Sequence, residues 1–570
     1  MSSPSPKLGA LGAFCLVLHG HLPWVLHHGR WPHGEDWLFE AAAETWLPLL
    51  EVLDACAAEG LRPAWTVGMT PILLEQLRQD RFRTGFADYL DHLVTQARRD
   101  ALTFEAREEA MLAALAESHA AHHLRQRAQF DAMDQDIPEA VFAHVRAGRI
   151  ELLSSNATHG YHPLLLHDAS ARGQLRAGLA TTERHFGARP AGIWLPECAY
   201  RPPGPWMPAA LHTDVRWRAG VASLAASVGV RYFVVDTHLV RDSRSEAVIE
   251  GDAVHKVEWS QAGWDHQRAW GSELEPHRVW EDGRATEVTV FARCPEVSEL
   301  VWSGEVGFPG DGRYLEFHKR HGTRGLRYWR VTGRVDLGAK EPYVPREAHE
   351  AVREHAARFV AIVRERIRAH HVGLGRAGVV CAPFDAELFG HWWHEGPSFL
   401  LEVARLLAAD PQVAAATLGE VVEQNPADKA SSIPEGSWGA GGDHRVWQND
   451  EMRLYWEVAY RAEDRFLSLW HEAPWQTDPT CAALLQDAAR ELLLVQASDW
   501  PFVISTRGAV DYGLRRVFEH AAAFDDLCNG VLDAAADPPR PPDLAVTEAA
   551  RRVALFDGVF PDLDLAWWGP

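Results

Sequence analysis

The sequence has few cysteines and no paired-cysteine motif. Its 570 residues include seven cysteines, an odd number, which are scattered and form no Cys-x-x-Cys pair. That pattern argues against a disulfide framework or a zinc knuckle and is typical of a reducing compartment, so we expect a cytoplasmic protein. The cysteines are Cys15, Cys56, Cys198, Cys294, Cys381, Cys481 and Cys528.

Long apolar runs and an excess of basic residues are missing as well. No stretch of about 20 apolar residues occurs. The short run Leu11–Leu18 leads into His-Gly-His, which predicts a buried strand and not a signal peptide. Acidic residues outnumber basic ones by 79 to 56, and the net charge is −23. Such a chain is a poor counter-charge for phosphate backbones or anionic lipid. We therefore expect a neutral partner, with neither nucleic acid nor membrane, and a monomer or small homo-oligomer.

Tryptophan is abundant in this sequence and tyrosine is scarce, with 24 Trp against 10 Tyr. Most of these rings are expected to fill a large core, but Trp is also suited to stacking on the flat face of a ligand. The hydrophobic fraction of 47% and the charged fraction of 24% are those of a globular protein. The chain is about four times as long as the commonest domain, which favours one large barrel with a satellite domain.

Short apolar runs recur along the first 387 residues, with helical patterns between them. Strands that alternate with helices predict a parallel sheet with crossover connections. Seven such units predict an α/β fold with a seven-stranded (β/α)7 barrel, one unit short of the (β/α)8 type. A doubly wound open sheet is the structural alternative, but no G-x-G-x-x-G follows the first run, which excludes its dinucleotide-binding version. The runs are 11–21, 62–68, 149–160, 191–197, 230–238, 286–293 and 378–387.

Two stretches depart from this alternation. Residues from about 75 to 145 have helical spacing and no strand, which predicts a helical insertion in a catalytic barrel that spans 1–415. After about residue 415 the apolar runs stop. A Gly-rich loop at 434–447 leads into helical patterns, so we expect 416–570 to form a helical C-terminal domain that contributes to the substrate cleft. Those patterns cover 446–470, 480–497 and 509–535.

Polar side chains gather where the predicted strands end, which is where barrel enzymes carry their chemistry. Hydrolysis or transfer at a glycosidic bond needs two carboxyl groups from different strands, and Glu197 and Asp385 meet that need. For either residue alone, a structural salt bridge or a helix cap is the competing interpretation. The strand ends offer His19, His21, Ser154, Asn156, His159, Glu197, Asp236, His238, Arg293, Asp385 and Glu387.

Three of these segments resemble signature regions of glycoside hydrolase family 57. They are His-Gly-His-Leu-Pro-Trp (19–24), IWLPECAY (193–200) and FDAELFGHWWHEGP (384–397). Within the family, VWSGEVGFPGDGRYLEFH (301–318) and GSWGAGGDHRVW (436–447) look most like the 1,4-α-glucan branching enzymes. The resemblance covers essentially the whole chain.

The resemblance implies an enzyme that cleaves an α-1,4 bond with retention and transfers the chain to a 6-OH. It implies Glu197 as nucleophile, Asp385 as general acid/base, an α-glucan substrate, and no metal or organic cofactor. For a retaining enzyme we expect the two carboxyl groups to lie about 5–5.5 Å apart. The residues that would bind glucan are His19, His21, Arg293, Gly310, Trp438 and Asp499.

Several of these residues also have a plain physical interpretation. Arg293 can hold a carboxylate ionised and bond sugar hydroxyls, or form only a structural ion pair. Trp438 lies in a Gly-rich loop that cannot bury it locally, which favours a stacking platform. Asp499 precedes Pro501 and can equally be a helix-terminal turn residue. Gly310 lies in a Pro-Gly-Asp turn, where backbone can approach a ligand closely.

Other functions remain open at this point. A metal-dependent amidohydrolase also begins with His-x-His, but it needs further ligands on the middle strands, where Arg293 is a poor neighbour for a dication. A non-catalytic glucan-binding protein is a second alternative. Within the family, the strongest alternative function is that of an α-glucan hydrolase or a 4-α-glucanotransferase. The long polar loop at 240–271 has no tyrosine, and we hypothesise that one of its tryptophans shields the cleft from water. These are Trp259, Trp264 and Trp270.

Overall fold

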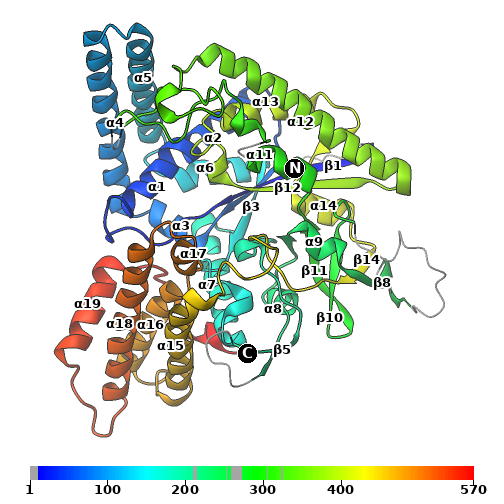
Figure 1. Cartoon of the computed structure of the whole chain (residues 1–570). Coiled ribbons are helices and arrows are strands. Elements are labelled where there is room, and N and C mark those ends of the chain that lie inside the picture. The colour runs from blue at the N-terminus through cyan, green and yellow to red at the C-terminus, as the bar shows by residue number, and fades with distance from the viewer. Residues whose placement is uncertain (1–9, 209–214, 252, 258–271, 304–305, 323–324) are drawn as a thin grey trace.

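The computed structural model describes residues 10–208, 215–251, 253–257, 272–303, 306–322 and 325–570. Its centre is a set of parallel strands in the order β12-β1-β2-β3-β4, with β13 paired to β1. All of these strands except β13 follow the predicted apolar runs, and nearly all of their side chains are buried because helices cover them (Figure 1). They are β1 (Gly12–Gly20), β2 (Trp65–Met69), β3 (Ile150–Ser155), β4 (Ile193–Trp194), β12 (Gly378–Asp385) and β13 (Val413–Ala415).

A second sheet has the order β7-β11-β10-β14-β8-β9. Within it, β7 and β11 run parallel, and they correspond to the two remaining predicted runs. Parallel bridges at Gly192–Tyr232 and Arg293–Cys381 connect this sheet to β4 and β12. The prediction of an α/β protein with a parallel sheet is thus confirmed. The strands are β7 (Tyr232–Val235), β8 (Arg244–Glu250), β9 (Ala253–Lys256), β10 (His277–Glu281), β11 (Arg284–Ala292) and β14 (Lys429–Ser432), and a separate antiparallel pair is β5 (Gly204–Trp206) with β6 (Arg216–Arg218).

Two expectations about strands are wrong. The stretch 240–271, expected to be a polar loop, holds β8 and β9 in its described part. Strands also do not stop at about residue 415, because β14 pairs with β8 and β10. Both errors have one cause. These strands are short and rich in polar residues, as in Lys-Ala-Ser-Ser at β14, so they lack the apolar run that marks a buried parallel strand.

Helices connect the parallel strands and pack against them (Figure 1). The long helix α12 precedes β12, and α13 follows it. Between β1 and β2, a π-helical segment η1 (Ala42–Trp46) joins α1 to α2. The connecting helices are α1 (Glu35–Ala41), α2 (Leu47–Ala58), α7 (Asp168–Phe186), α8 (Val221–Ser227), α9 (Thr237–Arg241), α11 (Pro295–Trp302), α12 (Pro345–Leu374), α13 (Gly396–Ala408) and α14 (Leu418–Gln424).

Two further groups of helices lie outside this alternation. Between β2 and β3, α4 and α5 form a long antiparallel hairpin, where the helical insertion was expected (Figure 1). The chain then ends in a packed group of helices, which includes the three predicted patterns. The first group is α3 (Pro71–Leu77), α4 (Asp80–Ala106), α5 (Ala110–Ala132) and α6 (Ile137–Arg146). The second is α15 (Arg453–Glu472), α16 (Pro479–Val495), α17 (Asp499–Ser505), α18 (Val510–Ala534) and α19 (Leu544–Phe556).

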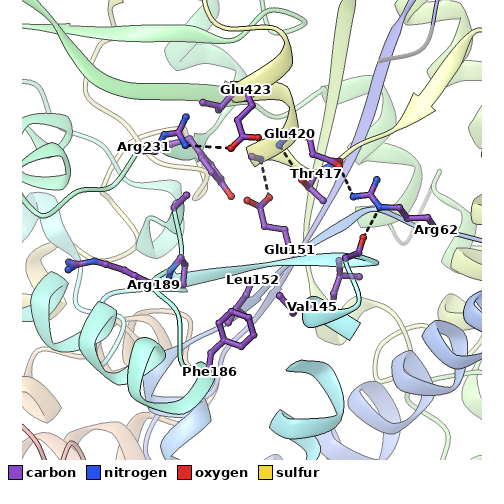
Figure 2. Close-up of a pocket in the computed structure, with 17 residues that line it drawn as sticks. Arg62, Val145, Glu151, Leu152, Phe186, Arg189, Arg231, Thr417, Glu420 and Glu423 are labelled. Atoms are coloured by element: carbon purple, nitrogen blue, oxygen red, sulfur yellow. Dashed lines mark hydrogen bonds and ion pairs between the residues drawn. The ribbon is translucent and has the colours of Figure 1, made fainter. Parts of the chain in front are cut away.

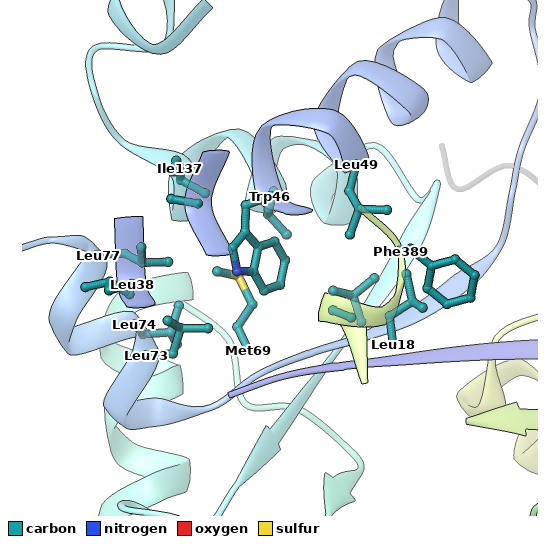
Figure 3. Close-up of a cluster of buried hydrophobic side chains, with 14 of the residues drawn as sticks. Leu18, Leu38, Trp46, Leu49, Met69, Leu73, Leu74, Leu77, Ile137 and Phe389 are labelled. Atoms are coloured by element: carbon teal, nitrogen blue, oxygen red, sulfur yellow. The ribbon is translucent and has the colours of Figure 1, made fainter. Parts of the chain in front are cut away.

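The core under the end of β1 explains one glycine of the His-Gly-His segment. Trp46 is 2% exposed and packs among apolar side chains of β1, β2 and the surrounding helices (Figure 3). A Cβ added at Gly20 would overlap the Trp46 ring. Glycine is therefore required at this position, and its neighbours His19 and His21 are anchored beside a packed core.

All seven cysteines are free and buried. In the part of the chain that the structure describes, no helix is both long enough and apolar enough to span a bilayer.

Candidate active site

A cavity of about 650 Å³ opens at the carboxyl ends of the parallel strands. It brings together every predicted site residue except Gly310, although they come from opposite ends of the chain. Four tryptophans form part of its wall. The lining residues are His19, His21, His159, Glu197, Arg293, Trp302, Asp385, Glu387, Trp392, Trp438, Gly439, Ala440, Val446, Trp447, Asp499, Phe502 and Thr506.

Glu197 follows β4 in a strained backbone conformation. Its φ and ψ are 60° and 24°, and Cys198 also has a positive φ of 50°. Side chains with a Cβ rarely adopt this left-handed region, so the surroundings must hold it. The amide of Cys198 donates to the carbonyl of Leu195 at 2.8 Å, and the amide of Trp438 donates to the carbonyl of Glu197 at 3.1 Å. Backbone strain at a carboxylate that lines a cavity is typical of a functional position.

Trp438 also contacts the Glu197 side chain. Its indole Nε1 donates to Oε2 of Glu197 at 2.8 Å. The Trp438 ring stands edge-on to Trp194 and Trp302, with centroids 5.0 Å and 5.6 Å away. Burial raises the pKa of Glu197 to about 7, and the hydrogen bond from Trp438 partly opposes that rise. Trp438 therefore orients the carboxylate, and its expected use as a stacking platform stays a prediction.

Asp385 ends β12 beside His19, because these two residues are paired in the parallel register of β1 and β12. Burial raises the pKa of Asp385 well above its usual value, and the charges of Glu387 and Glu197 raise it further, while Arg293 opposes them. The direction of this shift favours the protonated form of Asp385, which is the form that a general acid requires.

Arg293 both forms an ion pair and lies in the cavity wall. Its Nε and Nη2 donate to Asp236 at 3.1 Å and 2.6 Å, which is a bidentate ion pair. The same guanidinium lies 5.9 Å from the centre of the Trp438 ring and forms part of the cavity wall. A fixed cation in this place favours negative charge on the neighbouring carboxyl groups.

Histidines connect the strand ends to α17. The His21 Nε2 donates to Asp499 at 2.9 Å, and its Nδ1 pairs with Thr70 Oγ1 at 3.0 Å. His159, which follows β3, bonds Ser498 at 2.8 Å and His19 at 3.1 Å. Burial lowers the pKa of both His19 and His159, so these rings are neutral at pH 7. The chain of contacts holds the C-terminal helices against the strand ends.

Among the described residues, two groups could hold a metal ion. His21, His159 and Asp499 place ligand atoms close together, as do His28, His520 and Asp557. The rings of His21 and His159 stack 4.0 Å apart at 19°, so their nitrogen lone pairs run side by side and do not converge on one ion. In the second group, His520 is already hydrogen-bonded to Glu491 and to the cationic Arg516. Both groups fit hydrogen bonding better than metal binding, and metal independence stays a prediction.

Some strand-end residues have other roles. Gly310 is not among the described residues that line the cavity. It ends the turn η4 (Phe308–Gly310), in which the ring of Phe308 stacks on that of His355 with centroids 4.4 Å apart. His238 pairs with the carbonyl of Gly442 at 2.9 Å and so holds the Gly-rich loop. Ser154 and Asn156 bond buried neighbours instead of the cavity. Trp259, Trp264 and Trp270 of the shielding hypothesis lie outside the described residues.

Residues that were not predicted to act in the site also line the cavity, among them His159, Glu387 and Trp392. His159 and Glu387 stood among the strand-end side chains, so position alone was the available signal. Trp392 is 52% exposed and packs against Phe317, with centroids 4.4 Å apart. An exposed Trp at a cavity rim is suited to stacking on a sugar ring.

A second cavity, of about 340 Å³, lies at the opposite, amino-terminal ends of the strands (Figure 2). Four of its charged side chains form ion pairs, Arg62 with Glu420 at 2.7 Å and Arg231 with Glu423 at 3.8 Å, and Arg189 donates to the carbonyl of Val228 at 2.8 Å. Glu151 accepts the amide of Gly419 at 3.0 Å. This pairing is that of a structural charge network, so the chemistry belongs to the first cavity.

Two family models match most of this chain. A model of glycosyl hydrolase family 57 matches residues 15–434, and a model described as the C-terminal part of 1,4-alpha-glucan branching enzyme matches 458–568. The 1,4-alpha-glucan branching enzyme of Thermococcus kodakarensis is 37% identical over 91% of this chain and 74% of that protein. A probable 1,4-alpha-glucan branching enzyme of Mycobacterium tuberculosis is 33% identical over 99% of this chain and 98% of that protein.

Solved structures show the same fold. The GH57-type branching enzyme of Pyrococcus horikoshii superposes with a TM-score of 0.87 at 34% identity, and the match covers 98% of this chain and 97% of that one. The alpha-amylase AmyC of Thermotoga maritima superposes with a TM-score of 0.78 at 27% identity, over 98% and 99% of the two chains.

Proposed function

We infer that this chain, which belongs to glycosyl hydrolase family 57, is a 1,4-α-glucan branching enzyme. It is a transferase that acts on α-glucan of the glycogen type. The observation that carries this assignment is the match of both parts of the chain, the family 57 region and the branching-enzyme C-terminal region, to one kind of enzyme. The cavity adds a physical reason, because two carboxyl groups from different strands meet in it beneath a wall of tryptophans.

We propose that Glu197 is the nucleophile. In the first step, its carboxylate attacks C1 of a glucose unit, and the bond from C1 to the O4 of the next unit breaks. Asp385 donates its proton to that departing O4. The result is a glycosyl ester on Glu197, with the configuration at C1 inverted. The hydrogen bond from Trp438 supports this role because it holds the Glu197 carboxylate, which lines the cavity, in one orientation.

In the second step, Asp385 acts as the base. Its carboxylate takes the proton of an acceptor 6-OH, and the acceptor O6 attacks C1 of the glycosyl ester. The ester bond breaks, Glu197 regains its carboxylate, and an α-1,6 branch forms. Two inversions give net retention, and no redox change or external reactant is needed.

We propose that His19, His21, Arg293, Trp438 and Asp499 bind the glucan around this reaction centre. Their place in the cavity wall supports the role, and the bond from His21 to Asp499 presents two polar groups side by side. Gly310 was assigned only by resemblance, and its position outside the cavity wall gives that assignment no support.

We also propose that the seven parallel strands close into a (β/α)7 barrel within residues 1–415. The bridges at Gly192–Tyr232 and Arg293–Cys381 support closure, and so does one buried cluster that gathers side chains from six of the strands. Apart from β14, residues 416–570 would then form the helical domain that completes the cleft, with Trp438, Asp499 and Phe502 among the residues that it contributes. Free, buried cysteines support a cytoplasmic location.

An α-glucan hydrolase is the second candidate, because AmyC has the same fold along its whole length. Incubation with amylose separates the two. A branching enzyme forms α-1,6 linkages, seen as new anomeric proton signals and as side chains released by a debranching enzyme. A hydrolase gives only shortened linear chains with new reducing ends. The Glu197→Gln variant is the matched control and should give neither product, and a wild-type protein without α-1,6 products would overturn the assignment.

A further inference from the structure

A third carboxyl group lies in the catalytic cavity. Glu387 follows Asp385 by two residues, in the turn η6 (Ala386–Leu388) directly after β12, and it forms part of the same cavity wall. The mechanism above uses Glu197 and Asp385 and assigns nothing to Glu387. Two carboxyl groups this close in sequence, on one side of one cavity, influence each other's protonation.

Among the described residues, no cationic side chain forms an ion pair with the carboxylate of Glu387. Its Oε1 is buried and has no hydrogen-bond partner within the described parts of the chain. The backbone amides of His21 and of Glu387 itself are the hydrogen bonds that lower its pKa, but burial outweighs them and raises the pKa to about 7. An orphaned buried carboxyl oxygen is costly, so it calls for a reason.

The groups around this carboxyl pair are few. From the carboxyl end of β1 come His19 and His21, from the segment after β3 comes His159, and from the turn after β4 comes Glu197. Arg293 comes from the end of β11, and Asp499 from α17. His391, from the same segment as Glu387, is bonded to Glu44 at 2.5 Å. Arg293 is therefore the one permanent cation in this described set, and its guanidinium is committed to Asp236.

We propose that Glu387 is a positioning residue whose charge favours the protonated form of Asp385 and so keeps a proton on the general acid for bond cleavage. When Asp385 gives its proton to the departing O4, it becomes a carboxylate beside Glu387. It then recovers a proton from the acceptor hydroxyl in the second step. Between turnovers, repulsion by Glu387 disfavours loss of that proton to solvent. The inference rests on the proposed role of Asp385.

The pH profile of the Glu387→Gln variant tests this directly. Glutamine keeps the size of the side chain but cannot ionise, so the repulsion on Asp385 disappears and its pKa falls. The alkaline limb of kcat/KM for amylose should therefore move to lower pH, by about one unit. Activity on the acidic side of the optimum should change little. Glu387→Asp keeps the charge and should restore the wild-type limb.

Glu395→Gln is the matched control. Glu395 is another buried carboxyl of the same segment, with its pKa also raised to about 7 by burial and with one buried oxygen, Oε2, that lacks a partner among the described residues. Unlike Glu387, it does not line the cavity. Its substitution should leave the alkaline limb in place even if it lowers the melting temperature. An unmoved limb in Glu387→Gln, or an equal shift in Glu395→Gln, would overturn the proposal.

A donor with a good leaving group separates this proposal from the catalytic assignment. α-Maltosyl fluoride needs no proton on its leaving group, so the first step with this donor should have no alkaline limb in either wild type or Glu387→Gln. If Asp385→Asn retains full activity on amylose, the role of Asp385 fails. If Asp385→Asn is inactive on amylose while Glu387→Gln keeps the wild-type profile, only the role of Glu387 fails.

Discussion

The indole Nε1 of Trp438 donates a 2.8 Å hydrogen bond to Oε2 of Glu197, across 241 residues of sequence. The backbone of the two residues is joined as well, from the Trp438 amide to the Glu197 carbonyl at 3.1 Å. The Gly-rich loop after the parallel strands thus fixes both the main chain and the carboxylate of the proposed nucleophile. Positioning of this kind keeps a reacting group in one orientation before substrate arrives.

The Trp438→Phe variant should shift the acidic limb of the pH profile. Glu197 must be ionised to attack, and its pKa is raised to about 7 by burial, while the Trp438 bond lowers it. Phenylalanine removes that donor, so the pKa rises and the acidic limb of kcat/KM moves to higher pH. Trp302→Phe is the control, because Trp302 touches the Trp438 ring and lines the same cavity. A Trp438→Phe profile identical to wild type would show that the bond does not tune Glu197.

The stability of Glu197→Gln should depend on pH in a defined direction. The carboxyl has an ordinary pKa of 4.5 and a folded-state pKa of about 7, so the folded protein holds the proton more tightly between these values. This contribution to stability is complete below about pH 4.5 and is lost as the pH rises through 7. Glutamine never ionises and still offers an oxygen to Trp438. The melting temperature of the variant should match wild type near pH 5 and exceed it at pH 8. A gap that stays constant with pH would contradict this.

Exhaustive EDTA treatment should leave activity unchanged. The stacked rings of His21 and His159 are arranged for hydrogen bonding, and His21 is bonded to Asp499. His21→Ala should lower turnover by about tenfold or more, because Asp499 loses its partner and the glucan loses a polar contact. Its metal content should equal that of wild type when both are measured by elemental analysis. Activity that EDTA abolishes and zinc restores would instead support the amidohydrolase interpretation.

The seven parallel strands could be predicted because strands buried on both faces are nearly continuous apolar runs, as in Ala13–Leu18 of β1. The strands β8 and β14 could not, since β8 alternates exposed and buried residues over a short span and β14 is small and polar. Pairing partners, and not their own composition, make these segments strands.

The sequence was enough to predict the two carboxylates of the candidate site, but not the contacts that hold them in place. Glu197 and Asp385 stand at strand ends, where position and residue type point to chemistry. Nothing local in the sequence reveals that Glu197 adopts a φ of 60°, because no glycine marks the turn. The meeting of His21 with Asp499, 478 residues apart, depends on how α17 packs against the strand ends.

Trapping the glycosyl-enzyme tests the central claim most directly. In the Asp385→Asn variant, α-maltosyl fluoride can still form the ester on Glu197, because fluoride leaves without a proton, but the base for the second step is gone. We expect the intact protein to gain the mass of one maltosyl unit, and peptide mass spectrometry should place it on the segment that contains Glu197. The double variant with Glu197→Gln should gain no mass. An adduct on another residue, or an active Glu197→Gln enzyme, would contradict the account.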